Sequence, residues 1–404
     1  MINTLARFLL VVVCGGLLVV PVYGEENVFH IYHDADYSSH KESAQSMKMG
    51  FLTALDEMNN QVNGYRLKLI EKDHRGNTVR SKLHMQQFLK DPKALFMLGG
   101  LHSPPYIKHR DFINQNGILL AVPWAAGGPI TRYNKGKNWI YRLSIDDTKA
   151  GYRIAQFALD NKDCKNPHLL LEDTPWGKSN FKTMTSAISE KLGGAPQYTF
   201  FQWNTKLNTA QIILRNIISQ DVDCLLFVGN AIEGESFVRA MLAQEKQIPI
   251  VSHWGITGGN FHKTINYEVR KDLDLNFIQT CFSFISSKPT ELSKAVSSRA
   301  VTLFSDLNKA SDIPAPAGFI HAYDLTKIML SALQEISVAN TIEKNRSVLR
   351  EKLEGLSSPV NGLLKVYSKP FSQVSINNPD GHEALDLSDF CMGRYNADDN
   401  VILN

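Results

Sequence analysis

The feature that most constrains the fold of this chain is a strand–helix–strand unit that occurs twice. The two copies cover residues 94–128 and 224–259. In each copy, a first apolar run ends at glycine and a second ends beside a tryptophan. Gly100 and Trp124 are 24 positions apart, and Gly229 and Trp254 are 25 positions apart. A unit used twice predicts two similar lobes, whose strand ends would form the crevice in which α/β proteins bind ligands.

Strand-length and helix-length segments alternate along most of the chain, which is typical of a doubly wound parallel sheet. Predicted strands include 28–32, 65–71, 95–98, 118–122, 168–171, 198–203, 225–228, 248–252, 362–367 and 390–395. Predicted helices include 41–59, 78–89, 150–161, 179–192, 209–220, 290–308 and 318–334, and one helix-length segment lies between the strands of each repeated unit.

A chain of 404 residues is too long for one core, so two domains are expected. We therefore expect an α/β protein with two doubly wound, Rossmann-like lobes joined by a multi-strand hinge. The predicted lobe boundaries are 25–143 with 284–365 for the first lobe and 144–283 with 366–404 for the second, with crossings near 139–144, 275–284 and the C-terminus.

The N-terminus has the pattern of an export signal. Arg7 precedes an apolar run over 8–20, and the small residues Val22 and Gly24 follow it. This pattern predicts a signal peptide cleaved after Gly24. The alternative, a membrane anchor, would need roughly 20 apolar residues. Cys14 lies inside the run rather than at its end, which argues against a lipoprotein. We expect a periplasmic and monomeric protein.

Four cysteines follow the predicted cleavage site, at positions 164, 224, 281 and 391. They contain no C-x-x-C pair, and their spacing matches no zinc site. A disulfide between Cys164 and Cys224 is conceivable, because both residues directly precede predicted strands. Buried free thiols are the alternative for all four.

Charge and motif content exclude several classes of function. The formal net charge of +3 is too small to indicate nucleic-acid binding, and no basic stripe with interleaved aromatic residues occurs. The sequence contains no nucleophile elbow, P-loop, H-E-x-x-H or kinase signature, so we expect neither an enzyme nor a cofactor. His30 and His33 with Asp34 and Asp36 resemble metal ligands, but the two histidines fall on opposite faces of a strand. We therefore expect no metal site.

The strand exits carry residues suited to binding a small molecule. Ser103 offers a hydroxyl, and Ala125 and Ala126 precede an expected helix start, where free N–H groups would favour a carboxylate. Three tryptophans, Trp124, Trp176 and Trp254, also lie at strand exits and can form apolar walls, stack on rings or hold a cation. The alternative for each is a core or hinge residue. Tyr37, Asn230 and His253 complete the set of candidate binding residues at these exits.

Five segments carry a resemblance to a known family. They are SMKMGF with LDEMN at 46–51 and 55–59, GGLHS at 99–103, VPWAA at 122–126, DTPWG at 173–177 and FIHAYD at 319–324. In this order they resemble the signatures of type I periplasmic binding proteins of the leucine/isoleucine/valine-binding family, the solute receptors of ABC importers. The resemblance covers residues 28–395.

The resemblance implies specific roles for several residues. Ser103 and the amides of Ala125 and Ala126 would hold the carboxylate of the ligand, and Trp176 would cover the ligand from the second lobe. The chain departs from the family pattern at Ala126, where a threonine is common. It departs again near Trp254, where amino-acid receptors carry an acidic residue for the ammonium group and this chain has His253.

These observations lead to a functional expectation. We expect an extracytoplasmic solute-binding protein that closes two lobes on a small polar ligand and delivers it to the membrane permease of an ABC importer. The ligand would be amino-acid-like, an amide or an organic acid, and aromatic or cationic character is left open. The alternative is a ligand-sensing receptor subunit that signals to a membrane sensor kinase or chemoreceptor.

Overall fold

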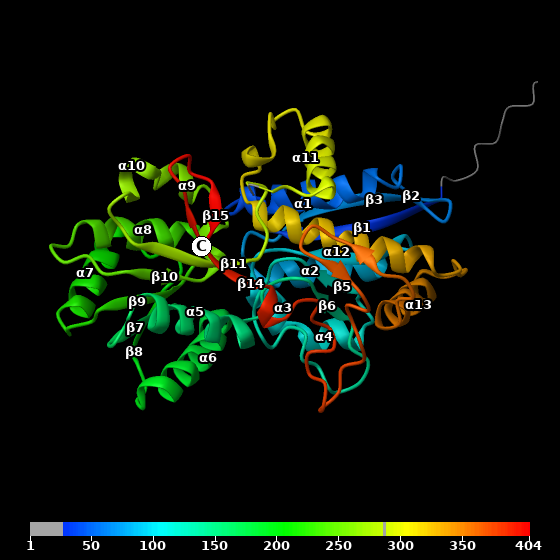
Figure 1. Ribbon diagram of the computed structural model, residues 1–404. Helices are drawn as coiled ribbons and strands as arrows, with labels where there is room; N and C mark the ends of the chain where they lie inside the picture. Colours follow the sequence, from blue (N-terminus) through cyan, green and yellow to red (C-terminus); the bar gives the residue numbers. More distant parts are fainter. Residues whose placement is uncertain (1–26, 286–287) are drawn as a thin grey trace, which may run out of the picture.

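The computed structural model describes residues 27–285 and 288–404, which form two large sheets lying side by side with helices on their faces, and one small two-stranded sheet (Figure 1). We call the six-stranded sheet and its helices lobe one, and the seven-stranded sheet and its helices lobe two. The predicted signal peptide lies outside the described residues. Within the described part of the chain, no helix is long and apolar enough to cross a membrane.

The sheet of lobe one has the strand order β2-β3-β1-β4-β5-β6. Its strands are β1 (Val28–Ala35), β2 (Gln61–Val62), β3 (Tyr65–Asp73), β4 (Ala94–Gly99), β5 (Leu120–Val122) and β6 (Ile140–Arg142). β1 lies between β3 and β4 and runs parallel to both. Every residue of β4 and β5 is buried, as expected for parallel strands covered by helices on both faces.

The sheet of lobe two has the strand order β15-β14-β11-β10-β9-β7-β8. Its strands are β7 (Pro167–Glu172), β8 (Gln197–Phe201), β9 (Cys224–Val228), β10 (Ile250–Ser252), β11 (Leu275–Thr280), β14 (Phe390–Tyr395) and β15 (Val401–Leu403). The strands from β8 to β11 are parallel, whereas β14 pairs antiparallel with both β11 and β15. The doubly wound fold predicted for both lobes is therefore confirmed.

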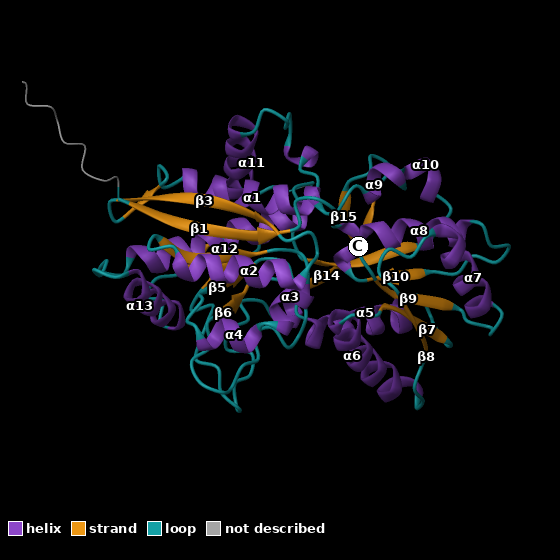
Figure 2. Cartoon of the chain, turned by 180° about the vertical axis from the view of Figure 1, so that it is seen from behind, coloured by secondary structure: helices purple, strands orange, loops and turns teal. Residues whose placement is uncertain are grey.

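Helices cover the faces of the two sheets, and Figure 2 shows them from behind. The helices of lobe one are α1 (Lys41–Asp56), α2 (Thr78–Lys90), α3 (Ser103–Lys108), α4 (Arg110–Gln115), α11 (Glu291–Leu303), α12 (Pro316–Gln334) and α13 (Ile342–Glu354). Those of lobe two are α5 (Asp147–Asn161), α6 (Pro175–Leu192), α7 (Leu207–Ile218), α8 (Ala231–Leu242), α9 (Phe261–Thr264) and α10 (Tyr267–Arg270).

Gly50 shows how closely two of these helices pack. A Cβ at Gly50 of α1 would lie 2.2 Å from the carbonyl oxygen of Phe319 in α12, so the side-by-side packing of α1 and α12 requires glycine there.

The chain passes between the lobes after β6, after β11 and between α13 and β14. Arg142, at the end of β6, is fully buried and fixes the first of these crossings. Its guanidinium donates to both carboxylate oxygens of Glu383 at 2.7 Å and to Asp146 at 2.9 Å. Both carboxylates compensate the buried charge of Arg142. The ion pair with Glu383 also ties the C-terminal part of the chain to the first crossing.

Several local predictions were wrong. The single helix expected after Ser103 is two short helices, because His109 leaves the helical conformation and its Nε2 lies 2.9 Å from the carbonyl oxygen of Thr78. The strand expected at 362–367 is instead a turn between two short strands, β12 (Val360–Asn361) and β13 (Val366–Tyr367). The amides of Leu363 and Leu364 donate to Asp324, so they do not join a sheet.

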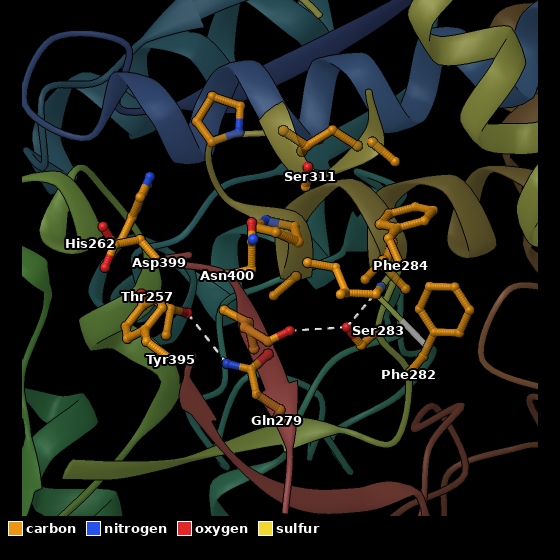
Figure 3. Close-up of a pocket in the computed structure, with 18 residues that line it drawn as sticks. Thr257, His262, Gln279, Phe282, Ser283, Phe284, Ser311, Tyr395, Asp399 and Asn400 are labelled. Atoms are coloured by element: carbon orange, nitrogen blue, oxygen red, sulfur yellow. Dashed lines mark hydrogen bonds between the residues drawn. The ribbon is translucent and has the colours of Figure 1, made fainter. Parts of the chain in front are cut away.

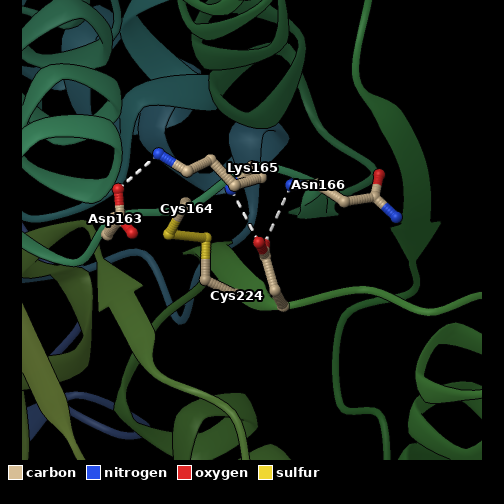
Figure 4. Close-up of a disulfide and its surroundings, with 6 residues drawn as sticks. Asp163, Cys164, Lys165, Asn166 and Cys224 are labelled. Carbon is tan, nitrogen blue, oxygen red and sulfur yellow. Dashed lines mark hydrogen bonds and ion pairs between the residues drawn. A yellow bond between two sulfur atoms is a disulfide. The ribbon is translucent and has the colours of Figure 1, made fainter.

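Two disulfides resolve the alternatives for the cysteines. Cys164 is bonded to Cys224, and Figure 4 shows the bond beside the starts of β7 and β9. The backbone amides of Lys165 and Asn166 donate to the Asp223 carboxylate next to it. Cys281, directly after β11, is bonded to Cys391 in β14. All four cysteines in the described part of the chain are paired, so the free-thiol alternative is wrong for them.

Candidate ligand-binding cleft

A cleft lies where the strand exits of the two lobes meet. The cleft is narrow, and its lining includes residues from both repeated units. Lobe one contributes Leu101, His102, Ser103, Pro104, Trp124 and Ala126, and lobe two contributes Glu172, Trp176, Asn230, Trp254 and Gly255.

Three tryptophans dominate the walls of the cleft. Trp124 and Trp254 follow β5 and β10, and their ring centroids lie 5.5 Å apart across the two lobes. Trp176 begins α6, and its ring lies edge-on to that of His253 at 5.1 Å. The indole N–H groups of Trp124 and Trp176 are buried without a hydrogen-bond partner. A buried donor without a partner is costly, so a ligand oxygen that accepts from either group would remove that cost.

Ser103 holds the loop of lobe one in place. Its Oγ accepts a hydrogen bond from the Gly127 amide at 2.9 Å, which leaves its own hydroxyl hydrogen available to another acceptor. Ala126 also lines the cleft. The amide of Ala125, in contrast, donates to the Gly100 carbonyl at 3.2 Å. No helix starts between Ala126 and β6, because the chain runs there through turns, so the helix start expected after Ala126 is wrong.

Glu172 and Asn230 form the polar wall of lobe two. Asn230 donates to the Glu172 carboxyl at 3.2 Å. Burial, reinforced by the nearby charge of Glu233, raises the pKa of Glu172 to about 8. Glu172 therefore keeps its proton at neutral pH and can donate a hydrogen bond as well as accept one. Glu172 ends β7 directly before the DTPWG segment, so its position at a strand exit was the signal that could have identified it.

Three of the candidate residues from the sequence, Ala125, His253 and Tyr37, are not part of the lining of the cleft. His253 is fully buried, and its Nε2 lies 2.9 Å from a carboxylate oxygen of Asp147 in α5. Its ring contacts that of Trp176 at right angles. Tyr37 lies in the loop after β1, where its hydroxyl contacts Nδ1 of His33 at 2.7 Å. The lining also includes five residues that the sequence did not indicate: Leu101, His102, Pro104, Glu172 and Gly255.

Glycines make room for the tryptophans. A Cβ at Gly318 of α12 would lie 2.3 Å from the Trp124 ring, and one at Gly255 would lie 2.7 Å from the Trp176 ring. Both distances are shorter than the contact distance between a Cβ and a ring carbon atom. The ring positions therefore depend on the absence of a side chain at these two points.

A second pocket, of about 610 Å³, lies between the lobes near β11 and the start of α12 (Figure 3). Phe282, Phe284 and neighbouring apolar residues form much of its wall. Several of its polar groups are bonded to other protein groups: Gln279 donates to Thr257 at 3.4 Å, and the Ser283 hydroxyl donates to the Val401 carbonyl at 2.9 Å. This pocket is larger than the tryptophan-lined cleft, but Thr257 is the one residue of its lining that belongs to either repeated unit.

Comparison with known proteins supports the fold. A family described as periplasmic binding protein matches residues 34–371. No curated protein matches the sequence. Among solved structures, the leucine-binding protein LivK from Thermotoga maritima has a TM-score of 0.74 and 15% identity, over 93% of this chain and 97% of that chain.

The names of two further similar structures include ligands other than amino acids. A solute-binding protein of an ABC transporter from R. palustris, in complex with 4-hydroxybenzoate, has a TM-score of 0.74 and 14% identity over 93% of this chain and 95% of that chain. A fatty acid ABC transporter substrate-binding protein from Thermomonospora curvata has a TM-score of 0.74 and 12% identity over 93% and 91%. At these identities the similarity shows the fold and leaves the ligand open.

Proposed function

The chain belongs to the periplasmic binding protein family, and from this premise we propose that it is an extracytoplasmic solute receptor of an ABC importer. It would close its two lobes on a small molecule and deliver that molecule to a membrane permease. One observation carries this proposal: a single cleft is lined by the same strand exits of the repeated unit in both lobes. A ligand that contacts both walls favours the closed arrangement.

The chemistry of the cleft indicates the class of ligand. The lining contains no lysine or arginine, and its one carboxyl group, Glu172, is protonated at neutral pH. Burial lowers the pKa of His102 to about 4, so this imidazole is also uncharged. The ligand would therefore meet apolar indole walls together with hydrogen-bond donors from indole, hydroxyl and amide groups. We infer a small organic acid or amide with an aromatic or aliphatic body.

Free branched-chain amino acids fit this cleft less well. Their ammonium group needs an ionised carboxylate or several acceptors. Glu172 is the one carboxyl group in the lining, and it already accepts from Asn230. An amino acid that bound here would have to ionise Glu172 first, which would cost binding free energy at neutral pH.

Export is part of the proposal. The predicted signal peptide and two disulfides are both typical of proteins in an oxidising compartment outside the cytoplasm.

A calorimetric screen tests the function. The mature chain, freed of bound small molecules by unfolding and refolding, would be titrated with aromatic carboxylates, fatty acids, amides and branched-chain amino acids. We expect an acid or an amide to bind with one molecule per chain and to raise the melting temperature. Failure of every class would contradict the proposal. Binding without uptake by the cognate permease in vesicles would favour the sensor alternative.

A further inference from the structure

A buried group of two histidines and one aspartate lies at one end of the cleft. Asp36, His40 and His102 each present one ligand atom, and these three atoms lie within 4.8 Å of one another. One oxygen of Asp36, Oδ2, lies 3.2 Å from Nδ1 of His40 and 3.1 Å from Nε2 of His102. Ligand atoms around a tetrahedral ion, with bonds of about 2.0–2.1 Å, are separated by about 3.3 Å. The observed spacing is therefore close to that of a metal site.

The fold fixes these three side chains from two neighbouring strands. Asp36 follows β1, His40 precedes α1, and His102 lies between β4 and α3. Because β1 and β4 are parallel neighbours, their exits bring the three residues together. His30 and His33, which the sequence suggested as metal ligands, take no part in this group.

The carboxylate of Asp36 is oriented by the backbone. Its Oδ1 accepts from the amides of Ser38 and Ser39 at 3.2 and 2.8 Å, which leaves Oδ2 facing both imidazoles. Support of this kind holds a carboxylate in position as a ligand. Among the hydrogen bonds and ion pairs of the described residues, no lysine or arginine contacts Asp36. Its charge therefore has no permanent cationic partner at close range.

Nδ1 of His40 donates to Oδ2 of Asp36 in the ion-free protein, and it presents a lone pair to an ion once its hydrogen moves to Nε2. The other ring nitrogen of His40, Nε2, is buried and has no hydrogen-bond partner. No hydrogen bond at Nε2 therefore fixes which of the two ring nitrogens carries the hydrogen. The nearby His74 is different. Its Nδ1 accepts from the Gly76 amide at 3.0 Å, which places the hydrogen on Nε2 in the neutral ring. We therefore exclude His74 from the set of ligands.

We propose that Asp36, His40 and His102 bind one divalent transition-metal ion of the zinc type at the end of the cleft. Two imidazoles and a carboxylate suit such an ion, and three protein ligands leave a fourth position open. His102 also lines the cleft, so the cleft gives the ion access and a solute oxygen or a water can take the fourth position. Metal binding to lobe one does not require the solute-binding function proposed above.

Metal titration of the mature, untagged chain tests the proposal. After treatment with a chelator and its removal, the protein would be titrated with Zn²⁺ by calorimetry and with Co²⁺ by visible absorption. We expect one equivalent of each ion to bind, with a Co²⁺ spectrum typical of tetrahedral coordination and a rise in melting temperature. Absence of binding at micromolar Zn²⁺ would overturn the proposal, whether or not the same protein binds a solute.

Variants locate the site. Asp36→Asn keeps an oxygen for the amides of Ser38 and Ser39, so it is expected to fold while losing the anionic ligand. We expect Asp36→Asn, His40→Ala and His102→Ala each to lower Zn²⁺ affinity at least about tenfold. His84→Ala is the matched control, because His84 pairs with the buried carboxylate of Asp34 at 2.6 Å outside the group. Wild-type affinity in the folded Asp36→Asn variant, or an equal loss in His84→Ala, would contradict the assignment.

Discussion

The indole rings of Trp124 and Trp254 lie 5.5 Å apart, although one belongs to lobe one and the other to lobe two. They occupy the same place in the two copies of the repeated unit, directly after its second strand. The repeat in the sequence therefore becomes a pair of facing walls in the structure. Because each ring contacts the other lobe, these walls connect the ligand cleft to the relative position of the lobes.

Trp176 is the best single probe of the cleft. Trp124 is fully buried in the core, and its replacement by alanine would cost about 3–5 kcal/mol of stability. Trp176 lies at the start of α6, and its indole N–H has no partner. We expect Trp176→Phe to keep the fold and to weaken ligand binding at least about tenfold through the lost donor, because each 1.4 kcal/mol is tenfold in affinity. Calorimetry measures this change.

Trp139→Phe is the control for this experiment. Trp139 is half-buried, and the Arg350 guanidinium lies over its ring at 5.9 Å, away from the cleft. Equal losses of ligand affinity in Trp176→Phe and Trp139→Phe would show that Trp176 affects binding through the stability of the fold and not through a contact with the ligand.

Ser103→Ala should affect both stability and binding. The Gly127 amide would lose its acceptor and remain buried, which costs about 1–3 kcal/mol in the free energy of unfolding. Denaturant unfolding of the ligand-free variant measures this effect. Ligand affinity should fall further because the free hydroxyl hydrogen is also removed. An unchanged affinity would show that the hydroxyl does not contact the ligand.

Glu172→Gln should change how stability depends on pH. The pKa of Glu172 is raised to about 8 in the folded protein, against 4.5 for a glutamate exposed to water. Its favourable contribution is therefore fully present below about pH 4.5 and is lost as the pH rises through about 8. We expect Glu172→Gln to be close to the wild type in stability at pH 5 and more stable than the wild type at pH 8.5. Chemical denaturation at the two pH values measures this difference. An equal difference at both would show that Glu172 ionises normally.

Reduction of the Cys164–Cys224 bond should destabilise lobe two. The bond joins residues 60 positions apart, and a loop of that length corresponds to about 4 kcal/mol of stabilisation in the chain-entropy model. We expect Cys164→Ser with Cys224→Ser to lower the melting temperature clearly. The paired variant Cys281→Ser with Cys391→Ser tests the second bond separately. Melting temperatures equal to that of the wild type would contradict both pairings.

Trp203 is expected to stabilise the closed arrangement. It follows β8 in lobe two, and its ring lies 5.5 Å from that of His102 in lobe one. A Cβ at Gly76 would lie 1.9 Å from the Trp203 ring, so this ring packs directly on Gly76. We expect Trp203→Ala to lower ligand affinity several-fold with little change in unfolding free energy, because the ring is 37% exposed. Small-angle scattering of the ligand-free proteins should show a larger radius of gyration for Trp203→Ala than for the wild type. Equal radii would contradict this role.

Much of the fold could be predicted from the sequence, because alternating apolar runs and helical patterns specify parallel sheets locally. The candidate site was predicted from the positions of the strand exits. Six of the predicted residues do line one cleft: Ser103, Trp124, Ala126, Trp176, Asn230 and Trp254. Helix α13 was missed because its charged sequence, IEKNRSVLREKLE, has few apolar positions.

Other features depended on contacts that a linear pattern does not show. The raised pKa of Glu172 results from its burial and from the charge of Glu233, which lies 61 positions further along the chain, and the group of Asp36, His40 and His102 joins residues 66 positions apart. The amide of Ala125 is bonded to Gly100, a contact that removes it from the predicted carboxylate site.

A crystal structure of the mature protein with a ligand identified in the screen tests the central claim most directly. We expect ligand density beside Trp124, Trp176 and Trp254, with a ligand oxygen within hydrogen-bond distance of an indole N–H. Ligand density in the larger pocket beside Phe282 and Phe284, with the tryptophan-lined cleft empty, would contradict it.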